Sequence, residues 1–226
     1  MPEPQWAAVR ADLAGLSYIE VAAAGLPAAA PLVIGLHGRG SSADDLAGLA
    51  PAFDPGWRYV LPQAPRRLDF GAAGAGWSWY EPIPADVARM TAACATLGGF
   101  LAATHERLGV PPGRAALIGF SQGAVMTLDS GLRAAVPYAA LVAMSGYLAE
   151  SDELPSVIAA ARHQPILIVH GTEDRVLAVT LARRARQLLE ANGLTPEYQE
   201  FAMAHEIGEA SVAAVLTFLR THLAAP

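Results

Sequence analysis

The pentapeptide Gly-Phe-Ser-Gln-Gly at residues 119–123 is the strongest chemical signal in the sequence, because it matches the pattern G-x-S-x-G. It lies where an apolar, β-rich run (115–118) gives way to a helical run (124–128). A sharp turn there strains the serine backbone, and flanking glycines let strand and helix approach closely. The helix N-terminus also places N–H groups beside the serine oxygen. Ser121 is therefore the candidate nucleophile, and an ordinary N-cap serine is the alternative.

A serine hydroxyl is a weak nucleophile unless a nearby base removes its proton. Of the six histidines, His205 follows the last expected strand and precedes the last expected helix, which puts it at the same end of the sheet as Ser121. The other five lie within helices, precede a strand or close a strand; they are His37, His105, His163, His170 and His222. We expect His205 to be the base, and a loop histidine near an N-cap is the alternative.

An acid must fix the tautomer of that imidazole and stabilise its protonated form. The segment 170–175, His-Gly-Thr-Glu-Asp-Arg, directly follows an apolar strand and carries two carboxylates, Glu173 and Asp174. We favour Asp174, because its shorter side chain lies further along the loop and can point inward. Surface pairing of Asp174 with an arginine is the alternative. The chain order Ser121, Asp174, His205 is that of α/β-hydrolases.

A glycine-rich turn could bind the oxyanion of a tetrahedral intermediate. Residues 37–40, His-Gly-Arg-Gly, follow a buried strand and enter a helix capped by Ser41 or Ser42. Backbone N–H groups of this turn, together with that of Gln122, can donate to the same oxygen. By itself this motif predicts only a turn, so its assignment as an oxyanion site depends on the candidate nucleophile, base and acid.

These residues require a sheet that brings several strand ends to one edge. Apolar, β-rich runs alternate with segments of helical period along the chain. Expected strands cover 17–21, 31–37, 57–61, 114–120, 138–144, 165–170 and 196–201. Expected helices cover 42–50, 87–108, 122–132, 177–191 and 206–223. We therefore expect one α/β domain, residues 1–226, with a mostly parallel sheet and helices on both faces.

The segment 62–84 has no clear period and is rich in proline, glycine and aromatic residues. Long loops of this kind are usually functional or disordered, and the aromatics argue against disorder. We expect the loop to roof the site, with Trp77, Trp79 and Tyr80 binding substrate, and a self-packed plug is the alternative. Only about 20 residues separate the strands that end at 144 and begin at 165, which leaves no space for a large helical lid.

Composition excludes several other chemistries. The chain has 226 residues, 53% of them apolar, and a formal charge of −6. All 15 basic residues are arginines, and the absence of lysine excludes Schiff-base, pyridoxal-phosphate, P-loop and Ser-Lys chemistry. The acidic balance makes nucleic acid a poor partner. The chain has a single cysteine, Cys94, no apolar run long enough to span a membrane and no signal-peptide pattern. Together these features indicate a cytoplasmic protein.

The sequence resembles the phospholipase/carboxylesterase family of α/β-hydrolases, which includes the acyl-protein thioesterases. Four segments carry the resemblance by their order and spacing: residues 36–40, 119–123, 170–174 and 204–205. The resemblance covers nearly the whole chain and extends to residues 62–65 and 79–80. It implies a serine hydrolase that uses no cofactor. No metal is expected either, because no cluster of histidine, aspartate and glutamate residues has the spacing of metal ligands. The triad would be Ser121, Asp174 and His205, and the oxyanion donors would be the backbone amides of Arg39 and Gln122. The sequence departs from the family pattern at Arg39, often apolar there, and at Ala204, usually glycine.

We therefore expect a serine carboxylic ester hydrolase that cleaves short- to medium-chain acyl esters through an acyl-enzyme. A long-chain acyl thioesterase or lysophospholipase is the alternative within hydrolases, and a non-catalytic binding module of the same fold is the alternative outside them. The expected partner is a small-molecule ester, without nucleic acid or membrane insertion. The oligomeric state stays open, with a homodimer as one option.

Overall fold

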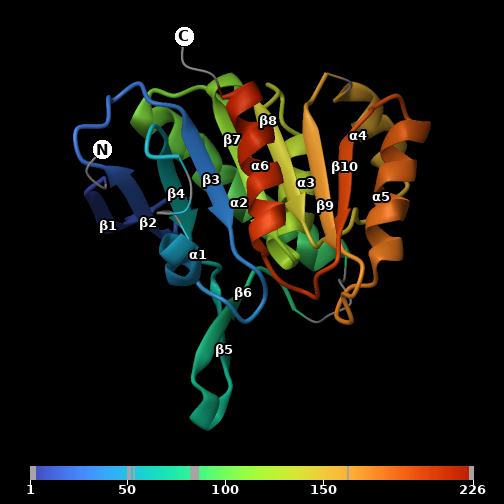
Figure 1. Cartoon of the computed structure of the whole chain (residues 1–226), viewed down its shortest axis with the longest axis horizontal. Coiled ribbons are helices and arrows are strands. Elements are labelled where there is room, and N and C mark those ends of the chain that lie inside the picture. Colours follow the sequence, from blue (N-terminus) through green and yellow to red (C-terminus); the bar gives the residue numbers. More distant parts are fainter. Residues whose placement is uncertain (1–3, 50–51, 53, 82–86, 162, 224–226) are drawn as a thin grey trace.

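The computed structural model describes residues 4–49, 52, 54–81, 87–161 and 163–223. Within them, eight strands form one sheet in the order β1-β2-β4-β3-β7-β8-β9-β10 (Figure 1). The strands are β1 (Trp6–Leu13), β2 (Leu16–Ala23), β3 (Leu32–Leu36), β4 (Arg58–Pro62), β7 (Ala115–Phe120), β8 (Ala140–Met144), β9 (Ile166–Gly171) and β10 (Glu197–Phe201). The helices are α1 (Ala43–Leu49), α2 (Val87–Leu108), α3 (Gln122–Leu132), α4 (Leu154–Ala160), α5 (Val179–Ala191) and α6 (Glu209–His222), and a short 3-10 turn, η3 (Pro112–Arg114), precedes β7.

The sheet is mostly parallel, as the sequence predicts. Strand β2 runs antiparallel to both of its neighbours, β1 and β4. From β4 through β3 and β7 to β10, every neighbouring pair is parallel. Their carboxyl ends therefore lie along one edge, where catalytic residues of an open α/β sheet are expected.

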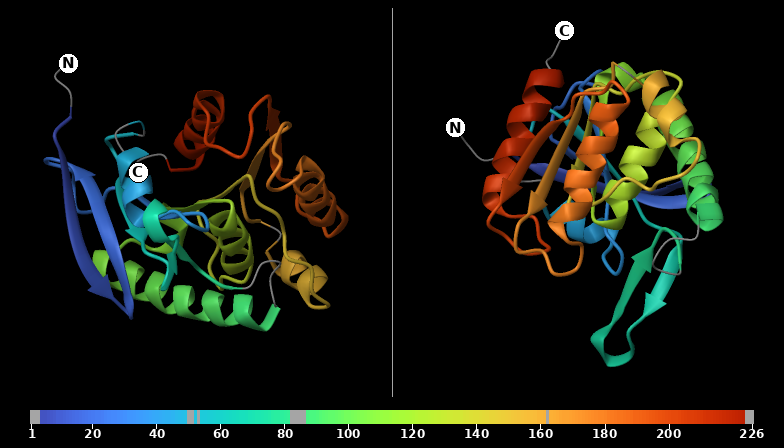
Figure 2. Two further views of the ribbon diagram at one scale, coloured as in Figure 1. Left: turned by 90° about the horizontal axis from the view of Figure 1, so that it is seen from below. Right: turned by 90° about the vertical axis from the view of Figure 1, so that its right-hand side faces the viewer.

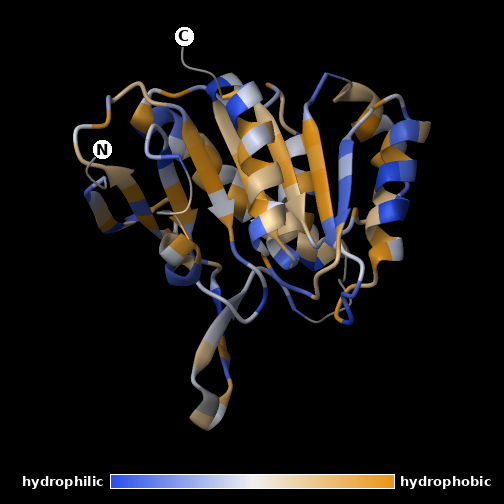
Figure 3. Ribbon diagram, in the orientation of Figure 1, coloured by the Kyte–Doolittle hydropathy of each residue, from blue (hydrophilic) through white to orange (hydrophobic). Residues whose placement is uncertain are grey.

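Helices cover both faces of this sheet, because alternate side chains of each central strand point to opposite sides (Figure 2). In β7, Leu117 belongs to the core cluster that α2, α3, α4 and α5 cover. Its neighbours Ala116 and Ile118 belong to a second cluster, which α1 and α6 cover. The central strands are accordingly apolar along their whole length, whereas α5 is apolar on one side only (Figure 3). The fold expectation of an α/β sheet with two helical layers is confirmed.

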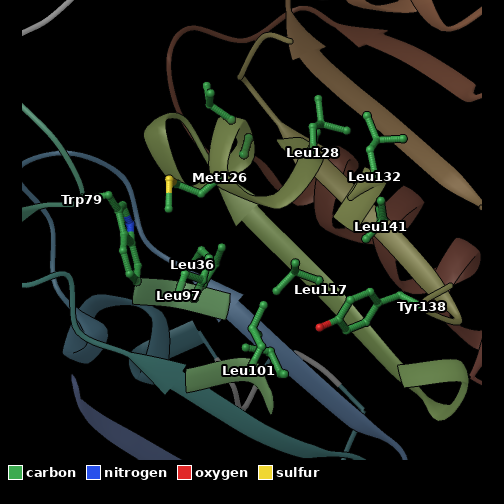
Figure 4. Packing of buried hydrophobic residues seen from close by; sticks show 14 of the residues in the cluster. Leu36, Trp79, Leu97, Leu101, Leu117, Met126, Leu128, Leu132, Tyr138 and Leu141 are labelled. Carbon is green, nitrogen blue, oxygen red and sulfur yellow. The ribbon is translucent and has the colours of Figure 1, made fainter. Parts of the chain in front are cut away.

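The larger core cluster locks the nucleophile-bearing elements together. Leu97 and Leu101 of α2 pack in one cluster with Met126 and Leu128 of α3 and with Leu117 of β7 (Figure 4). All five are almost completely buried. Burial of an aliphatic side chain of this size stabilises the fold by roughly 1.5–3 kcal/mol. The junction between β7 and α3 therefore sits on a rigid support.

Strand β1 and helix α4 were not expected from the sequence. Strand β1 lies at the sheet edge with mostly exposed side chains, so it lacks the apolar alternation of a half-buried strand. It joins β2 through a two-residue turn at Ala14 and Gly15, both with positive φ. Helix α4 has only 7 residues, too few for a clear helical period. No large lid lies between β8 and β9 in the part of the chain that the structure describes.

The segment 62–84 contains regular structure that the sequence analysis did not predict. Strands β5 (Arg66–Asp69) and β6 (Ala75–Ser78) form an antiparallel hairpin, with the 3-10 turn η2 (Gly71–Ala73) at its tip. The hairpin projects from the edge of the molecule where β3 ends (Figure 1). Residues 82–84 of the expected loop, like residue 50 of an expected helix, lie outside the described residues.

Across the described residues, we find no helix with both the length and the apolar character that a membrane span requires.

Candidate active site

Ser121 lies at the sharp junction between β7 and α3. It is the N-cap residue of α3, with φ 55° and ψ −118°. Its N–H donates to the carbonyl oxygen of Met144 at the end of β8, at 2.8 Å. A non-glycine residue in this region costs about 1–3 kcal/mol, and such strain concentrates at functional sites. The conformation presents the serine hydroxyl at the carboxyl edge of the sheet.

Two flanking glycines make this junction sterically feasible. A Cβ atom on Gly119 would lie 2.2 Å from the carbonyl oxygen of Gly123. A Cβ atom on Gly123 would lie 2.1 Å from the carbonyl oxygen of Leu36, at the end of β3. Because both contacts are with backbone atoms, neither can be relieved by rotating a side chain. The close approach of strand and helix that the motif predicts is present here.

Ser121, His205 and Asp174 form one continuous hydrogen-bonded chain. His205 Nδ1 lies 2.7 Å from Asp174 Oδ2, and His205 Nε2 lies 2.9 Å from Ser121 Oγ. An ionised carboxylate only accepts, so the Nδ1–H group donates to Asp174. His205 Nε2 then carries no proton and can accept the Ser121 hydroxyl proton. The side chain of Asp174 is fully buried, whereas that of His205 is 16% exposed and accessible to a substrate.

Asp174 is held in its ionised form. Burial alone would raise its pKa, but hydrogen bonds from His205 and from backbone N–H groups outweigh burial and lower the pKa of Asp174 below its ordinary value. The two backbone donors are the N–H groups of Val176 and Leu177, each 2.8 Å from Oδ1. The other candidate acid, Glu173, has an exposed side chain that makes no hydrogen bond within the described residues. Geometry therefore favours Asp174 over Glu173.

Three residues that support this chain were not singled out by the sequence analysis. The Phe120 ring lies 4.9 Å from the His205 imidazole, centroid to centroid. The buried His170 has Nε2 at 2.8 Å from the carbonyl oxygen of Leu177 and 3.3 Å from Asp174 Oδ2. A Cβ atom on Gly171 would lie 2.2 Å from the carbonyl oxygen of Met203, so β9 ends directly against the loop that carries His205. Both His170 and Gly171 precede Asp174 in the same motif, which was the available signal.

The glycine-rich turn lies beside the serine. A Cβ atom on Gly38 would lie 3.3 Å from the Cβ atom of Ser121. Within the described residues, neither the backbone N–H of Arg39 nor that of Gln122 has a hydrogen-bond acceptor. The two donors expected for the oxyanion are therefore both free for an external oxygen.

His37, at the end of β3, is a structural residue of this turn. Its Nδ1 lies 2.8 Å from the carbonyl oxygen of Gly38, and its Nε2 accepts the N–H of Ala64 at 3.0 Å. Burial lowers the pKa of His37, so the ring is neutral and both nitrogens are occupied.

Trp79 and Tyr80, expected to bind substrate, lie in the core instead. Their exposed fractions are 2% and 1%. The Gln122 side chain accepts the N–H of Trp79 at 2.9 Å and donates to the carbonyl oxygen of Tyr80 at 2.8 Å. The indole N–H of Trp79 donates to the carbonyl oxygen of His37 at 2.9 Å. We correct the assignment: these two aromatics anchor the turn and the first residue of α3, because burial leaves no surface for a substrate.

Trp77 is half-buried and remains our candidate for substrate contact. Its N–H donates to the carbonyl oxygen of Ser41 at 3.0 Å, and its carbonyl oxygen accepts the N–H of Gly40 at 2.8 Å. A Cβ atom on Gly76 would lie 2.1 Å from the carbonyl oxygen of Gly40. The base of the projecting hairpin is thus fixed to the glycine-rich turn.

Arg39 forms an ion pair that the sequence did not indicate. Its Nε lies 2.6 Å from Glu81 Oε1, and the two side chains are 43% and 26% exposed. The acidic residues that follow Arg39 most closely in the sequence are engaged elsewhere. Asp44 pairs with Arg10, and Asp45 accepts the hydroxyl of Ser41. Glu81 therefore offsets the positive charge that Arg39 brings to the turn.

This pairing predicts a charge-dependent effect of Arg39→Leu. The variant should hydrolyse a neutral short-chain ester within a few-fold of the wild-type kcat/KM, but should lower kcat/KM further for a hemisuccinate ester, because Glu81 is then unpaired. The extra loss should not exceed about 1 kcal/mol, the upper range for exposed pairs, and should shrink in high salt. The double variant Arg39→Leu/Glu81→Gln should recover the wild-type ratio. Collapse of both activities would instead mean that the turn depends on the Arg39 side chain.

The backbone position of Ala204, next to His205, does not require the glycine that the family pattern favours. It is exposed and is not among the described residues with positive φ. Alanine therefore fits the loop before His205 without strain.

Comparison with known proteins gives concordant matches. A family model described as Phospholipase/Carboxylesterase matches residues 16–223. Acyl-protein thioesterase 1 of Candida albicans is 26% identical over 228 residues, which cover 91% of this chain and 97% of that protein. Acyl-protein thioesterase 1 homolog 2 of Dictyostelium discoideum is 30% identical over 128 residues, which cover 53% of this chain and only 57% of that protein. The crystal structure of esterase PE8 is 30% identical, with a TM-score of 0.77, and the match covers 86% of this chain and 94% of PE8.

Proposed function

The chain belongs to the phospholipase/carboxylesterase family of α/β-hydrolases, and on that premise we propose that it is a serine carboxylic ester hydrolase acting on short- to medium-chain acyl esters. The observation that carries the proposal is the hydrogen-bonded chain from Asp174 through His205 to Ser121, beside two free backbone donors. We assign Ser121 as nucleophile, His205 as base and Asp174 as acid. The N–H groups of Arg39 and Gln122 bind the oxyanion.

The reaction follows from these positions. Ser121 Oγ attacks the ester carbonyl carbon while His205 Nε2 takes the hydroxyl proton. The carbonyl oxygen becomes an oxyanion that accepts hydrogen bonds from the two N–H groups. His205 then returns the proton to the alkoxide as the carbon–oxygen bond breaks, which leaves an acyl group on Ser121. Water, activated by His205 in the same way, hydrolyses this acyl-enzyme and frees the serine.

The shape of the site supports short acyl groups. An open cleft of about 760 Å³ adjoins His205 and Asp174 and is lined largely by polar residues. The apolar pocket beside Gly119, between β3, β7 and Ile207, has only about 20 Å³. That volume holds about one water-sized group, so this pocket cannot take a long acyl chain.

Cys94 does not compete for the role of nucleophile. It lies on α2, packed against the core. Burial and the nearby charge of Asp129 raise the pKa of this thiol to about 12, so it is not ionised at neutral pH. We also propose that the chain acts in the cytoplasm on small-molecule esters, since a single cysteine cannot form an intramolecular disulfide.

Long-chain acyl thioester hydrolysis is the second candidate, because both curated relatives described above are named acyl-protein thioesterases. A substrate panel separates the two. We expect kcat/KM for p-nitrophenyl esters to peak at short or medium acyl chains, and palmitoyl-CoA and lysophosphatidylcholine to react much more slowly.

Wild type and Ser121→Ala should be assayed side by side on that panel. A peak at the longest chains, or preference for palmitoyl-CoA, would favour the thioesterase. Failure of a fluorophosphonate probe to label Ser121, together with no hydrolysis of any ester, would favour a non-catalytic binding module.

A further inference from the structure

Two segments of the chain line the cleft beside the triad. One wall is the segment after β9, residues 172–176, and the other is the loop with Ala204 and His205. The two walls meet at the hydrogen bond between Asp174 and His205. Any group bound in this cleft therefore lies next to the imidazole.

Arg175 in this cleft is an exposed cation without a partner. Of the arginines that the structure describes, only Arg66 and Arg175 have neither a hydrogen-bond acceptor nor an ion-pair partner. Arg66 lies on the projecting hairpin, whereas Arg175 lines the cleft itself. Arg39, in the glycine-rich turn, is already offset by Glu81. Arg175 is thus the cation beside the triad that is free to meet an external anion.

The backbone that carries Arg175 is fixed by the candidate catalytic acid. Asp174 Oδ1 accepts the N–H groups of Val176 and Leu177, which closes a turn around Arg175. The turn also displays Val176, whose exposed fraction is 68%. A rigid turn therefore presents an apolar side chain and a guanidinium side by side at the cleft.

The chemistry of the reaction indicates which part of the ester enters this cleft. His205 Nε2 must return the proton to the departing oxygen, so the leaving group lies on the histidine side of Ser121. The carbonyl oxygen lies toward the N–H groups of Arg39 and Gln122. The cleft lined by His205 and Arg175 therefore receives the alcohol portion.

We propose that Arg175 is a specificity-determining residue that selects esters with a carboxylate or phosphate on the alcohol portion. The proposal rests on the esterase function proposed above. The guanidinium binds the anion, and Val176 contacts the carbon skeleton that joins it to the ester oxygen. Glu173, exposed on the same wall and without a partner in the described residues, opposes this selection through its charge. With a formal charge of −6, the chain as a whole also repels anions, so selection depends on this local cation.

The test compares two butyrate esters with nearly isosteric leaving groups, 3-carboxyphenyl butyrate and neutral 3-carbamoylphenyl butyrate. Arg175→Gln should lower the ratio of kcat/KM for the anionic over the neutral ester by about two- to fivefold, mainly through KM. The loss should shrink in high salt. Arg175→Lys should retain most of the ratio, and Glu173→Gln should raise it.

Arg186→Gln is the matched control, since it removes the same charge from the surface of α5, where Arg186 pairs with Glu190. An equal fall in the ratio for Arg186→Gln, or equal losses on both esters for Arg175→Gln, would overturn the proposal. An equal effect of Arg175→Gln on a hemisuccinate ester, whose anion lies on the acyl portion, would also overturn it. If the wild type hydrolyses neither ester and Ser121→Ala changes nothing, the esterase function itself fails, and that result differs from all of the above.

Discussion

Ser121→Ala should lower kcat for a p-nitrophenyl butyrate ester by at least about 10³-fold, and His205→Ala should have an effect of similar size. The serine oxygen becomes nucleophilic only when His205 Nε2, 2.9 Å away, takes its proton. Without the base the hydroxyl stays protonated, and without the hydroxyl the base has nothing to activate. The double variant should therefore be scarcely slower than either single variant, because the two residues act as one unit. The residual rate should come from the oxyanion donors and substrate binding, which neither substitution removes.

The measurement is the steady-state and single-turnover kinetics of the two single variants and the double variant. Thermal unfolding of each variant is the control. Ser121→Ala keeps a Cβ atom at the strained position and should leave Tm nearly unchanged. Additive losses, with the double variant slower by the product of the single effects, would mean that Ser121 and His205 do not act together. Retention of fluorophosphonate labelling in Ser121→Ala would place the nucleophile elsewhere.

The central elements could be predicted from the sequence because they are fully buried. Strands β3, β7, β8 and β9 are continuous apolar runs bounded by glycine or proline, and helix α3 was expected with the bounds that the structure has. The hairpin of β5 and β6 could not be predicted, because each strand has only 4 residues and β5 is mostly exposed. It is held instead by backbone contacts with the turn at Gly40, far from it in the sequence.

The triad candidates could be located for a related reason. Each follows a parallel strand, which is buried before Ser121 and Asp174 and partly exposed before His205, so the topology alone brings the three residues to one edge of the sheet. The partners that adjust the site depend on contacts across long stretches of sequence. Glu81 lies 42 residues after Arg39, and Trp79 lies 43 residues before Gln122. No local pattern signals such pairs, and this is why two core aromatics were assigned to substrate.

Asp174→Asn should lower kcat by about 10⁴-fold, whereas Glu173→Gln should change the rate on a neutral ester by no more than a few-fold. In Asp174→Asn, the amide oxygen can take the place of Oδ1 and accept the N–H groups of Val176 and Leu177, which fixes the amide orientation. The amide nitrogen, a donor, then faces His205 Nδ1 in place of Oδ2.

Two donors cannot face each other, so the imidazole of Asp174→Asn must move its proton from Nδ1 to Nε2. In that tautomer Nε2 can no longer accept the proton of Ser121, and the nucleophile is lost although the fold is kept. In the wild type, the lowered pKa of Asp174 keeps this acid ionised well into the acidic range, so protonation of Asp174 should not limit activity on mild acidification. The measurement is the pH profile of kcat for wild type, Asp174→Asn and Glu173→Gln, with unfolding curves to verify the fold. Equal losses for the two variants would mean that the acid is misassigned. Recovery of Asp174→Asn at high pH would contradict the tautomer account, because raising the pH does not return the proton to Nδ1.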